Sequence, residues 1–261
     1  MGREFSGQVA ARYARHRRGY PSEVVDVIAH AFGLGPDDIV LDLGCGTGQL
    51  TLPLAARVHA VIGMDPEPDM LDHARAAARE QGTDNVFWML GADRDLVRFP
   101  TMPGVPRRLA ALTVAVAIHW MDRDALFPAA RRLLRPGGGI AIVTNGAPLW
   151  LQDAAWSRDL QAVLEAWSGR SQTGACQTDE AGRRLNRDAL ERAGFQVTES
   201  AVSYDAPLAV DDVIGGVFSA LSGDGMPSVE SQAEFAARVR SALAPHGPLT
   251  EHVTVWIQTG R

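Results

Sequence analysis

The amino-acid sequence predicts an α/β fold in which a seven-stranded, mostly parallel sheet carries helices on both faces. Between residues 39 and 145, five short apolar runs alternate with segments of helical periodicity. These runs are apolar throughout rather than at every second position, as in parallel strands that are buried on both faces. At 261 residues, with 46% hydrophobic and 21% charged residues, the chain suits one large globular domain.

The first half of the chain supplies five of the expected strands and the helices between them. Pro21 is typical of a helix start, and Gly82 is typical of a helix end. The glycine-rich stretch "RPGGG" predicts a turn before the fifth strand. The expected strands are 39–43, 60–65, 85–93, 111–120 and 140–145. The expected helices are 21–32, 49–58, 67–82 and 122–134.

Past residue 146 the alternation gives way to a mainly helical segment. The pattern predicts, in order, a helix (148–167), a polar loop (168–182), a helix, turn and strand (189–208), further helices (205–245) and a final alternating strand (251–261). Within one compact domain, we divide the chain into an N-terminal segment (1–20), a core (21–146), a helical lid or insertion with a later strand (147–245) and a closing strand (246–261).

The net charge limits which partners are expected, and the cysteine content indicates the expected cellular location. The formal net charge of −6 argues against a nucleic-acid partner, although "ARYARHRRGY" near the N-terminus is locally basic. The two cysteines, Cys45 and Cys176, favour a reducing, cytoplasmic location. No apolar run has the length of a signal core or a membrane span, so no membrane partner is expected. Asp93 and Asp95 lack histidine partners, and no metal site is expected.

Three glycines at alternate positions, Gly44, Gly46 and Gly48, directly follow the first predicted strand. In parallel sheets, ligands bind where loops leave the carboxyl ends of the strands. Glycines at such a loop let the backbone turn sharply and approach a ligand closely. The helix that follows presents its amino-terminal amides, which favour negative charge. The alternative interpretation is a purely structural turn.

The spacing of these glycines distinguishes between nucleotide ligands. A dinucleotide loop has the spacing G-x-G-x-x-G, whereas here Gln49 occupies the third glycine position. The pattern Asp42-x-Gly44-x-Gly46-x-Gly48 resembles the first motif of class I S-adenosylmethionine-dependent methyltransferases. An acid at the tip of the second strand, Asp65, suits a ribose diol. Its alternative role is to cap the following helix.

Three further stretches carry the same resemblance. "GADRDL" (91–96) is loosely similar to the stretch that borders the adenine in that family. "AIHWMD" (117–122) with "LRPGG" (134–138) resembles a small-molecule branch that carries an Ala-Phe-His-Trp-like motif. "YARHRRGYP" (13–21) resembles Tyr-x-x-Tyr-Arg-Pro-x-Tyr-Pro of the same branch. The resemblance implies a Rossmann-like fold, S-adenosyl-L-methionine as cofactor, and an N-terminal segment that covers the cofactor.

The resemblance also implies which residues bind the cofactor. Tyr13 and Arg17 lie one helical turn apart and are expected near its carboxylate. Backbone carbonyls at Gly44 and Ala117 are expected to meet its ammonium. Which group meets the adenine amine stays open, because Ala92 stands where an acid is common. The residues expected to contact the cofactor are Tyr13, Arg17, Asp42, Gly44, Cys45, Gly46, Gly48, Asp65, Pro66, Met70, Ala92, Asp93 and Ala117.

A second set of residues is expected on the acceptor side. His119 follows the fourth strand and suits a general base, a cofactor or substrate contact, or a packing residue. None of the other six histidines has a comparable placement in the sequence. Trp120, Trp150 and Trp156 are candidates for the walls of an acceptor pocket, with core packing as the alternative.

These observations predict an enzyme that moves a methyl group to an oxygen, nitrogen or carbon of a small, natural-product-like acceptor of secondary metabolism. Three other functions stay open: a scaffold that binds the cofactor without catalysis, a methyltransferase acting on RNA or protein, and a dehydrogenase. The sequence leaves the acceptor, and the choice between monomer and homodimer, undetermined.

Overall fold

The computed structural model describes residues 5–99, 108–171, 177–220 and 227–261. Within these residues the strands form one seven-stranded sheet in the order β3-β2-β1-β4-β5-β7-β6. Neighbouring strands are parallel except at β7, which is antiparallel to β5 and to β6. The predicted fold class is therefore confirmed. The strands are β1 (Ile39–Leu43), β2 (Ala60–Asp65), β3 (Val86–Leu90), β4 (Leu109–Ala115), β5 (Leu134–Asn145), β6 (Val197–Leu208) and β7 (Leu249–Gly260).

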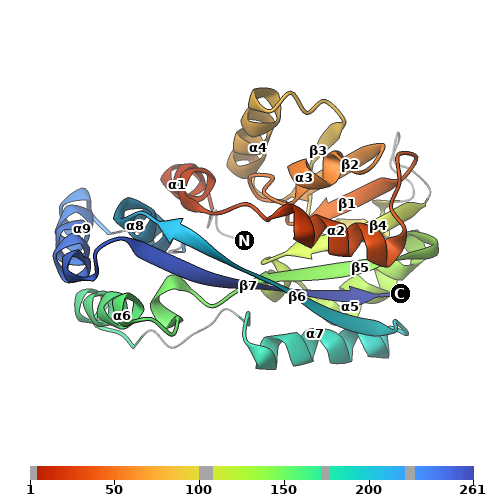
Figure 1. The fold of residues 1–261 in the computed structure, drawn as a ribbon. Helices are drawn as coiled ribbons and strands as arrows, with labels where there is room; N and C mark the ends of the chain where they lie inside the picture. Colours follow the sequence, from red (N-terminus) through yellow and green to blue (C-terminus); the bar gives the residue numbers. More distant parts are fainter. Residues whose placement is uncertain (1–4, 100–107, 172–176, 221–226) are drawn as a thin grey trace.

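Helices cover both faces of the sheet, and a further group gathers at one end of β6 and β7 (Figure 1). The helices are α1 (Gln8–His16), α2 (Ser22–Phe32), α3 (Thr51–Ala55), α4 (Pro68–Glu80), α5 (Arg123–Leu133), α6 (Ala155–Ser168), α7 (Glu180–Arg192), α8 (Val210–Ser219) and α9 (Val229–Leu243). Short 3₁₀ turns are η1 (Asp93–Val97), η3 (Ile118–Trp120), η4 (Leu149–Leu151) and η6 (Ala244–His246). The helix expected at 49–58 is shorter than predicted, and α7 begins nine residues before the helix expected at 189.

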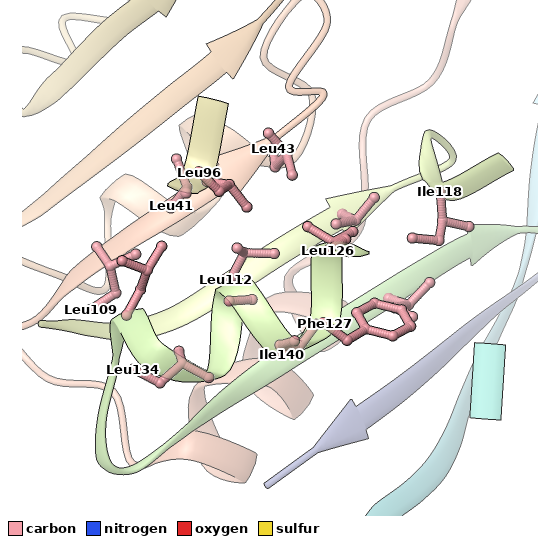
Figure 2. Close-up of a cluster of buried hydrophobic side chains, with 14 of the residues drawn as sticks. Leu41, Leu43, Leu96, Leu109, Leu112, Ile118, Leu126, Phe127, Leu134 and Ile140 are labelled. Carbon is pink, nitrogen blue, oxygen red and sulfur yellow. The ribbon is translucent and has the colours of Figure 1, made fainter. Parts of the chain in front are cut away.

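Two apolar layers fix the helices on the sheet. On one face, α5 and α7 pack against alternate residues of β1, β4 and β5, among them Leu41, Leu112 and Ile140 (Figure 2). On the other face, α2 and α3 pack against the intervening residues, such as Val40 and Ala141. Because successive side chains of a strand point to opposite faces, uniformly apolar strands supply both layers.

The glycine-rich stretch before the fifth strand lies within β5, which begins at Leu134. The chain still turns there, as expected: β5 advances from Leu134 to Gly139 while its partner β4 advances only from Leu109 to Ala111, and Gly137 has a φ of 78°. A Cβ on Gly138 would lie 2.5 Å from the carbonyl oxygen of Ala110, and one on Gly139 would lie 2.3 Å from that of Gly260. Glycine is therefore needed because β4 and β7 approach β5 too closely for a side chain.

The segment after residue 146 adds a helical cap, which we define as α6, α8 and α9. Its own apolar cluster joins residues of these helices to Leu208 at the end of β6 and Leu249 at the start of β7. Helix α1 lies between the cap and α4 (Figure 1) and contacts both. The N-terminal segment is thereby placed across the carboxyl ends of the central strands.

The strand order determines where a ligand site is expected. The chain moves outward from β1 through β2 to β3, and then returns to the other side of β1 with β4 and β5. Such a reversal leaves a crevice outside the carboxyl ends of the two strands between which the order changes, here β1 and β4. The glycine-rich loop after β1 and the segment after β4 both open onto this crevice.

Candidate active site

A cavity of about 660 Å³ lies at the carboxyl ends of the central strands. This volume falls in the range of roughly 300–1,000 Å³ that small-molecule sites occupy. One part is lined by the loop after β1, the tip of β2 and the segment after β3. The other part is lined by the ends of β4 and β5, the start of β7 and the cap. The N-terminal segment contributes residues along the length between them.

The glycine-rich loop has a backbone that side chains would disrupt. Gly44, Gly46 and Gly48 have φ of 68°, 54° and 90°, in the left-handed region that favours glycine. A Cβ on Gly44 would also lie 2.6 Å from the Cβ of Ala117 and 3.1 Å from the Cε of Met121. The loop after β1 is thus packed directly against the segment after β4, and the spacing requires glycine.

The Asp65 carboxylate connects the tip of β2 to this loop. Its Oδ2 accepts a hydrogen bond from the amide of Gly46 at 2.9 Å, and its Oδ1 accepts one from the amide of Glu67 at 2.9 Å. Asp65 is buried yet lines the cavity, and burial raises the pKa of its carboxyl. Each carboxylate oxygen retains a second lone pair for a ligand hydroxyl. Asp65 faces the cavity, as a ribose contact requires, whereas its bond to the Glu67 amide lies in the turn before α4, whose N-cap residue is Glu67.

Three residues of the glycine motif lie beneath the loop rather than against the cavity, which corrects the expectation of direct contact. Asp42 is buried and accepts hydrogen bonds from Thr51 Oγ1 at 2.6 Å and Thr113 Oγ1 at 2.7 Å, so it joins the loop's helix to β4. Cys45 is also buried, and burial raises the pKa of its thiol. Gly48 packs against the Trp88 ring, which a Cβ would meet at 3.2 Å.

Burial of Asp42 makes the stability of the fold depend on pH. Burial raises the pKa of Asp42 from 3.8 to about 6, even though the threonine hydrogen bonds oppose the shift. Because the pKa of Asp42 is higher in the folded state than in the unfolded state, this carboxyl contributes to stability below its unfolded-state pKa. The contribution is lost as the pH rises through about 6, where the buried carboxyl ionises. We therefore expect the stability of Asp42→Asn, measured relative to wild type, to increase by about 2–3 kcal/mol as the pH is raised from about 4 to about 8. Urea denaturation of both proteins across that range measures it; a pH-independent difference would contradict the expectation.

The N-terminal segment places both of its predicted residues in the cavity. The Tyr13 ring lies beside the glycine loop, with its Cε1 3.8 Å from where a Cβ on Gly46 would be. The guanidinium of Arg17 lies 5.3 Å from the Tyr13 ring centroid, and its Nε donates to Ser219 Oγ at 2.8 Å. Arg17 follows the last residue of α1 and has an extended backbone, so the two residues meet without sharing a continuous helix.

The segments after β2 and β3 supply the wall on the other side of Asp65. Pro66, Met70, Ala92 and Asp93 all line the cavity, with Met70 and Ala92 buried. The amide of Ala92 donates to Asp95 Oδ2 at 2.9 Å, which fixes the entry into η1. Asp93 Oδ2 accepts a hydrogen bond from the amide of Asp122 at 3.3 Å, so this carboxylate also holds the start of α5.

The chain turns sharply after β4, and this turn positions His119. The predicted strand 111–120 ends at Ala115 because Val116 has a φ of 50°, a strained value for a β-branched residue. The next residues form η3, in which the amide of Trp120 donates to the carbonyl of Ala117 at 3.0 Å. His119 lines the cavity, and burial, followed by the charge of Arg123, lowers its pKa.

The three predicted tryptophans differ in their surroundings. Trp120 is 50% exposed and lines the cavity, where the edge of Phe5 contacts it at 6.0 Å between ring centroids. Trp150 also lines the cavity. Trp156 does not, and the prediction of a pocket wall is wrong for it. Its ring is buried in the apolar cluster of the cap, and its Nε1 donates to the carbonyl of Thr250 at 3.2 Å.

Several residues of the cavity were missed in the sequence. Nothing in the sequence distinguishes His16 as a site residue, yet it lines the cavity. Its Nδ1 lies 2.9 Å from Asp212 Oδ1. Arg18 also lines it and forms a 2.7 Å ion pair with Glu251. The local run of basic residues was the only signal for them, because their partners lie about 200 residues away in the chain.

The described parts of the chain contain neither a metal-binding group of side chains nor a membrane-spanning helix. No group of three or more histidine, cysteine or acidic side chains is placed to hold a metal ion there. Among the helices described, none is both long and apolar enough to cross a membrane. Cys176 lies outside the described residues.

Comparisons with known proteins agree with this geometry. Residues 40–138 match the family model described as a methyltransferase domain. An uncharacterized methyltransferase of Mycobacterium tuberculosis is 34% identical over 158 residues, which cover 60% of this chain and 58% of that protein. A protein of Saccharomyces cerevisiae named as a probable S-adenosylmethionine-dependent methyltransferase is 30% identical over 135 residues, covering 51% of this chain and 44% of that protein. The matched region therefore spans 58% of one relative and 44% of the other.

A solved structure extends the similarity to the whole fold. A protein of Anaeromyxobacter dehalogenans described as a "putative type II methyltransferase" has a TM-score of 0.61 and 21% identity. The superposition covers 94% of this chain and 97% of that one. This similarity is one of fold. The stretch that matches the methyltransferase-domain model, residues 40–138, contains the glycine loop, Asp65 and His119.

Proposed function

We propose that this protein is an S-adenosylmethionine-dependent methyltransferase that moves a methyl group to an oxygen, nitrogen or carbon of a small acceptor molecule. The observation that carries the proposal is the arrangement of Gly44, Gly46 and Asp65, which line one end of a single cavity. The net charge of −6 favours a small acceptor over a nucleic acid. The cap, which covers the other end, is proposed as the lid that selects the acceptor.

The residues present fit the cofactor on structural grounds. Gly44 and Gly46 line the cavity without side chains of their own, and the Asp65 carboxylate, which accepts from the Gly46 amide, lines it beside them. A ribose diol would donate to Asp65, an adenine would lie against Met70 and Ala92, and a carboxylate would meet Arg17. When bound, S-adenosylmethionine supplies a sulfonium methyl group that an acceptor atom displaces in line.

The protein's own contribution is alignment and exclusion of water. The cavity continues from the glycine loop past Ala117 and His119 to the cap, so both reactants would be held in one continuous space. By holding the acceptor atom in line behind the methyl carbon, the protein removes much of the entropy cost of bringing the two reactants together in solution. Tyr13 and the rest of the N-terminal segment cover the space between the two halves and keep water from the reacting atoms.

Arg17 provides a test of the orientation of the cofactor. We expect Arg17→Met to weaken binding of S-adenosylhomocysteine about tenfold, because a charge-assisted hydrogen bond to its carboxylate is lost. Binding of 5′-methylthioadenosine, which has the same nucleoside but no carboxylate, should be unchanged. Calorimetric titration of both ligands into both proteins measures this. Equal losses for the two ligands would place Arg17 elsewhere.

His119 is proposed as the general base when the acceptor must lose a proton. Its lowered pKa keeps the imidazole neutral and able to accept a proton near neutral pH. We expect kcat/KM to rise with pH through that pKa and then to level, and His119→Gln to lower kcat by about 10²–10⁴-fold and flatten the profile. If His119 is a binding contact instead, the variant will change KM and keep the wild-type pH profile.

The reaction itself is tested with methyl-labelled S-adenosylmethionine and a panel of small alcohols, amines and activated carbon acids. The proposal predicts labelled product from at least one acceptor class, together with an equal amount of S-adenosylhomocysteine. Binding of the cofactor without transfer to any of them would favour a scaffold, and transfer only to RNA or protein would overturn the small-molecule assignment.

A further inference from the structure

The half of the cavity beside the cap contains polar groups that the proposed reaction does not use. Three buried side-chain atoms there have no hydrogen-bond partner in the structure: Arg18 Nη1, Asn145 Oδ1 and Trp150 Nε1. All three residues line the cavity. A buried polar group without a partner is unfavourable, so such groups are rare in folded proteins unless a ligand or water completes them.

These groups come from separate elements that a hydrogen-bond network holds in place. Arg18 lies between α1 and α2, Asn145 is the last residue of β5, and Trp150 belongs to η4. Arg18 Nη2 pairs with Glu251 Oε2 at 2.7 Å, and Glu251 Oε1 accepts from Gln152 Nε2 at 2.6 Å. Gln152 follows Trp150 by two residues. The network thus fixes the Arg18 guanidinium and the Trp150 segment on the same side of the cavity.

The charges of this network indicate what kind of group can bind. Arg18 and Glu251 neutralise each other, and the other members carry no charge. An anionic ligand would approach the Glu251 carboxylate, and a cationic one the Arg18 guanidinium, so neither is favoured. The unpartnered atoms offer two N–H donors and one amide oxygen. An uncharged carbonyl with a neighbouring N–H or O–H matches this set.

The surrounding walls are apolar and suit a partly hydrophobic molecule. Pro148, Leu149, Leu208 and Val253 line the same half of the cavity.

We propose that Arg18, Asn145 and Trp150 form a subsite for an uncharged carbonyl-containing group of the methyl acceptor, such as a carboxamide, lactam or hydroxy ketone. The carbonyl oxygen accepts from Arg18 Nη1 and Trp150 Nε1, and the adjacent N–H or O–H donates to Asn145 Oδ1. This inference rests on the proposed function, because it assigns this half of the cavity to the acceptor.

The test measures binding of three probes of similar shape to the protein saturated with S-adenosylhomocysteine. The probes are benzamide, benzoate and toluene, which carry a neutral carbonyl, an anion and no polar group. Calorimetry should show benzamide binding most tightly. Trp150→Phe, which removes the donor and keeps an aromatic ring, should weaken benzamide binding about three- to tenfold and leave toluene unchanged. Asn145→Leu removes the acceptor atom at similar volume and should act in the same direction.

Trp256→Phe serves as the matched control, because Trp256 lies on β7 outside the cavity lining and should leave all three affinities unchanged. Tighter binding of benzoate than benzamide, no binding of benzamide at millimolar concentration, or equal effects of Trp150→Phe on benzamide and toluene would each overturn the subsite. Failure to bind S-adenosylhomocysteine would instead count against the proposed function, so the two failures are distinguishable.

Discussion

Replacing Gly44 by alanine is expected to lower the affinity for S-adenosylhomocysteine by about a hundredfold while the protein stays folded. The substitution adds left-handed backbone strain of about 1–2 kcal/mol. It also places a Cβ 2.6 Å from that of Ala117, and overpacking of this kind costs about 1–3 kcal/mol. The loop is expected to relieve the contact by moving into the cavity, where the cofactor is proposed to bind. Calorimetric titration measures the affinity, and circular dichroism checks the fold.

Gly82 provides a control with nearly the same backbone but open surroundings. It follows α4 with a φ of 66°, and a Cβ there would meet no described atom within 4 Å. Gly82→Ala should therefore lose only the part of the stability that comes from backbone strain, and its affinity should be unchanged. If Gly44→Ala binds S-adenosylhomocysteine as tightly as Gly82→Ala does, the glycine loop is not the cofactor site.

Replacing Asp65 by alanine is expected to lower the affinity for S-adenosylhomocysteine by about a hundredfold or more. The substitution removes the proposed acceptor of the ribose hydroxyls and leaves the amides of Gly46 and Glu67 without their partner. The affinity for 5′-methylthioadenosine should fall equally, because it carries the same ribose. This pattern differs from that of Arg17→Met, which is expected to affect only the ligand with a carboxylate.

Asp69 is the matched acidic control for this experiment. It lies four residues further on, in α4, and its Oδ2 accepts a 2.6 Å hydrogen bond from the amide of Gly7 without lining the cavity. Asp69→Ala removes the same charge from the same region and should leave both affinities within about twofold of wild type. A loss in Asp69→Ala as large as in Asp65→Ala would show that general charge, not the ribose contact, is responsible.

Predictions from the sequence were most accurate for segments whose local residue pattern agrees with their buried environment in the fold. The first two strands were predicted at their observed bounds, 39–43 and 60–65, because each is an apolar run that ends at a turn residue. Gly44 and Asp65 were found for the same reason, since loops at strand ends carry ligand sites. Asp42 and Gly48 were assigned to the ligand because the motif shows spacing but not which side of the loop a residue occupies.

Residues whose role depends on distant contacts could not be predicted. His16 faces the cavity because α1 docks against α8, 196 residues away at the Asp212 contact. Arg18 depends in the same way on Glu251 at the start of β7. Trp156 was misjudged because a helical pattern shows which face is apolar but not whether that face lines a cavity or a core. The turn at the β5 glycines was predicted, but only the packed sheet shows how closely β4 and β7 approach them.

The most direct test of the proposed cofactor site is calorimetric titration of the wild-type protein with S-adenosylhomocysteine and, separately, with NAD. The proposal predicts one bound S-adenosylhomocysteine per chain, weakened in Gly44→Ala and in Asp65→Ala, and no heat of binding for NAD. Binding of NAD, or the absence of measurable binding of S-adenosylhomocysteine at millimolar concentration, would contradict the proposal.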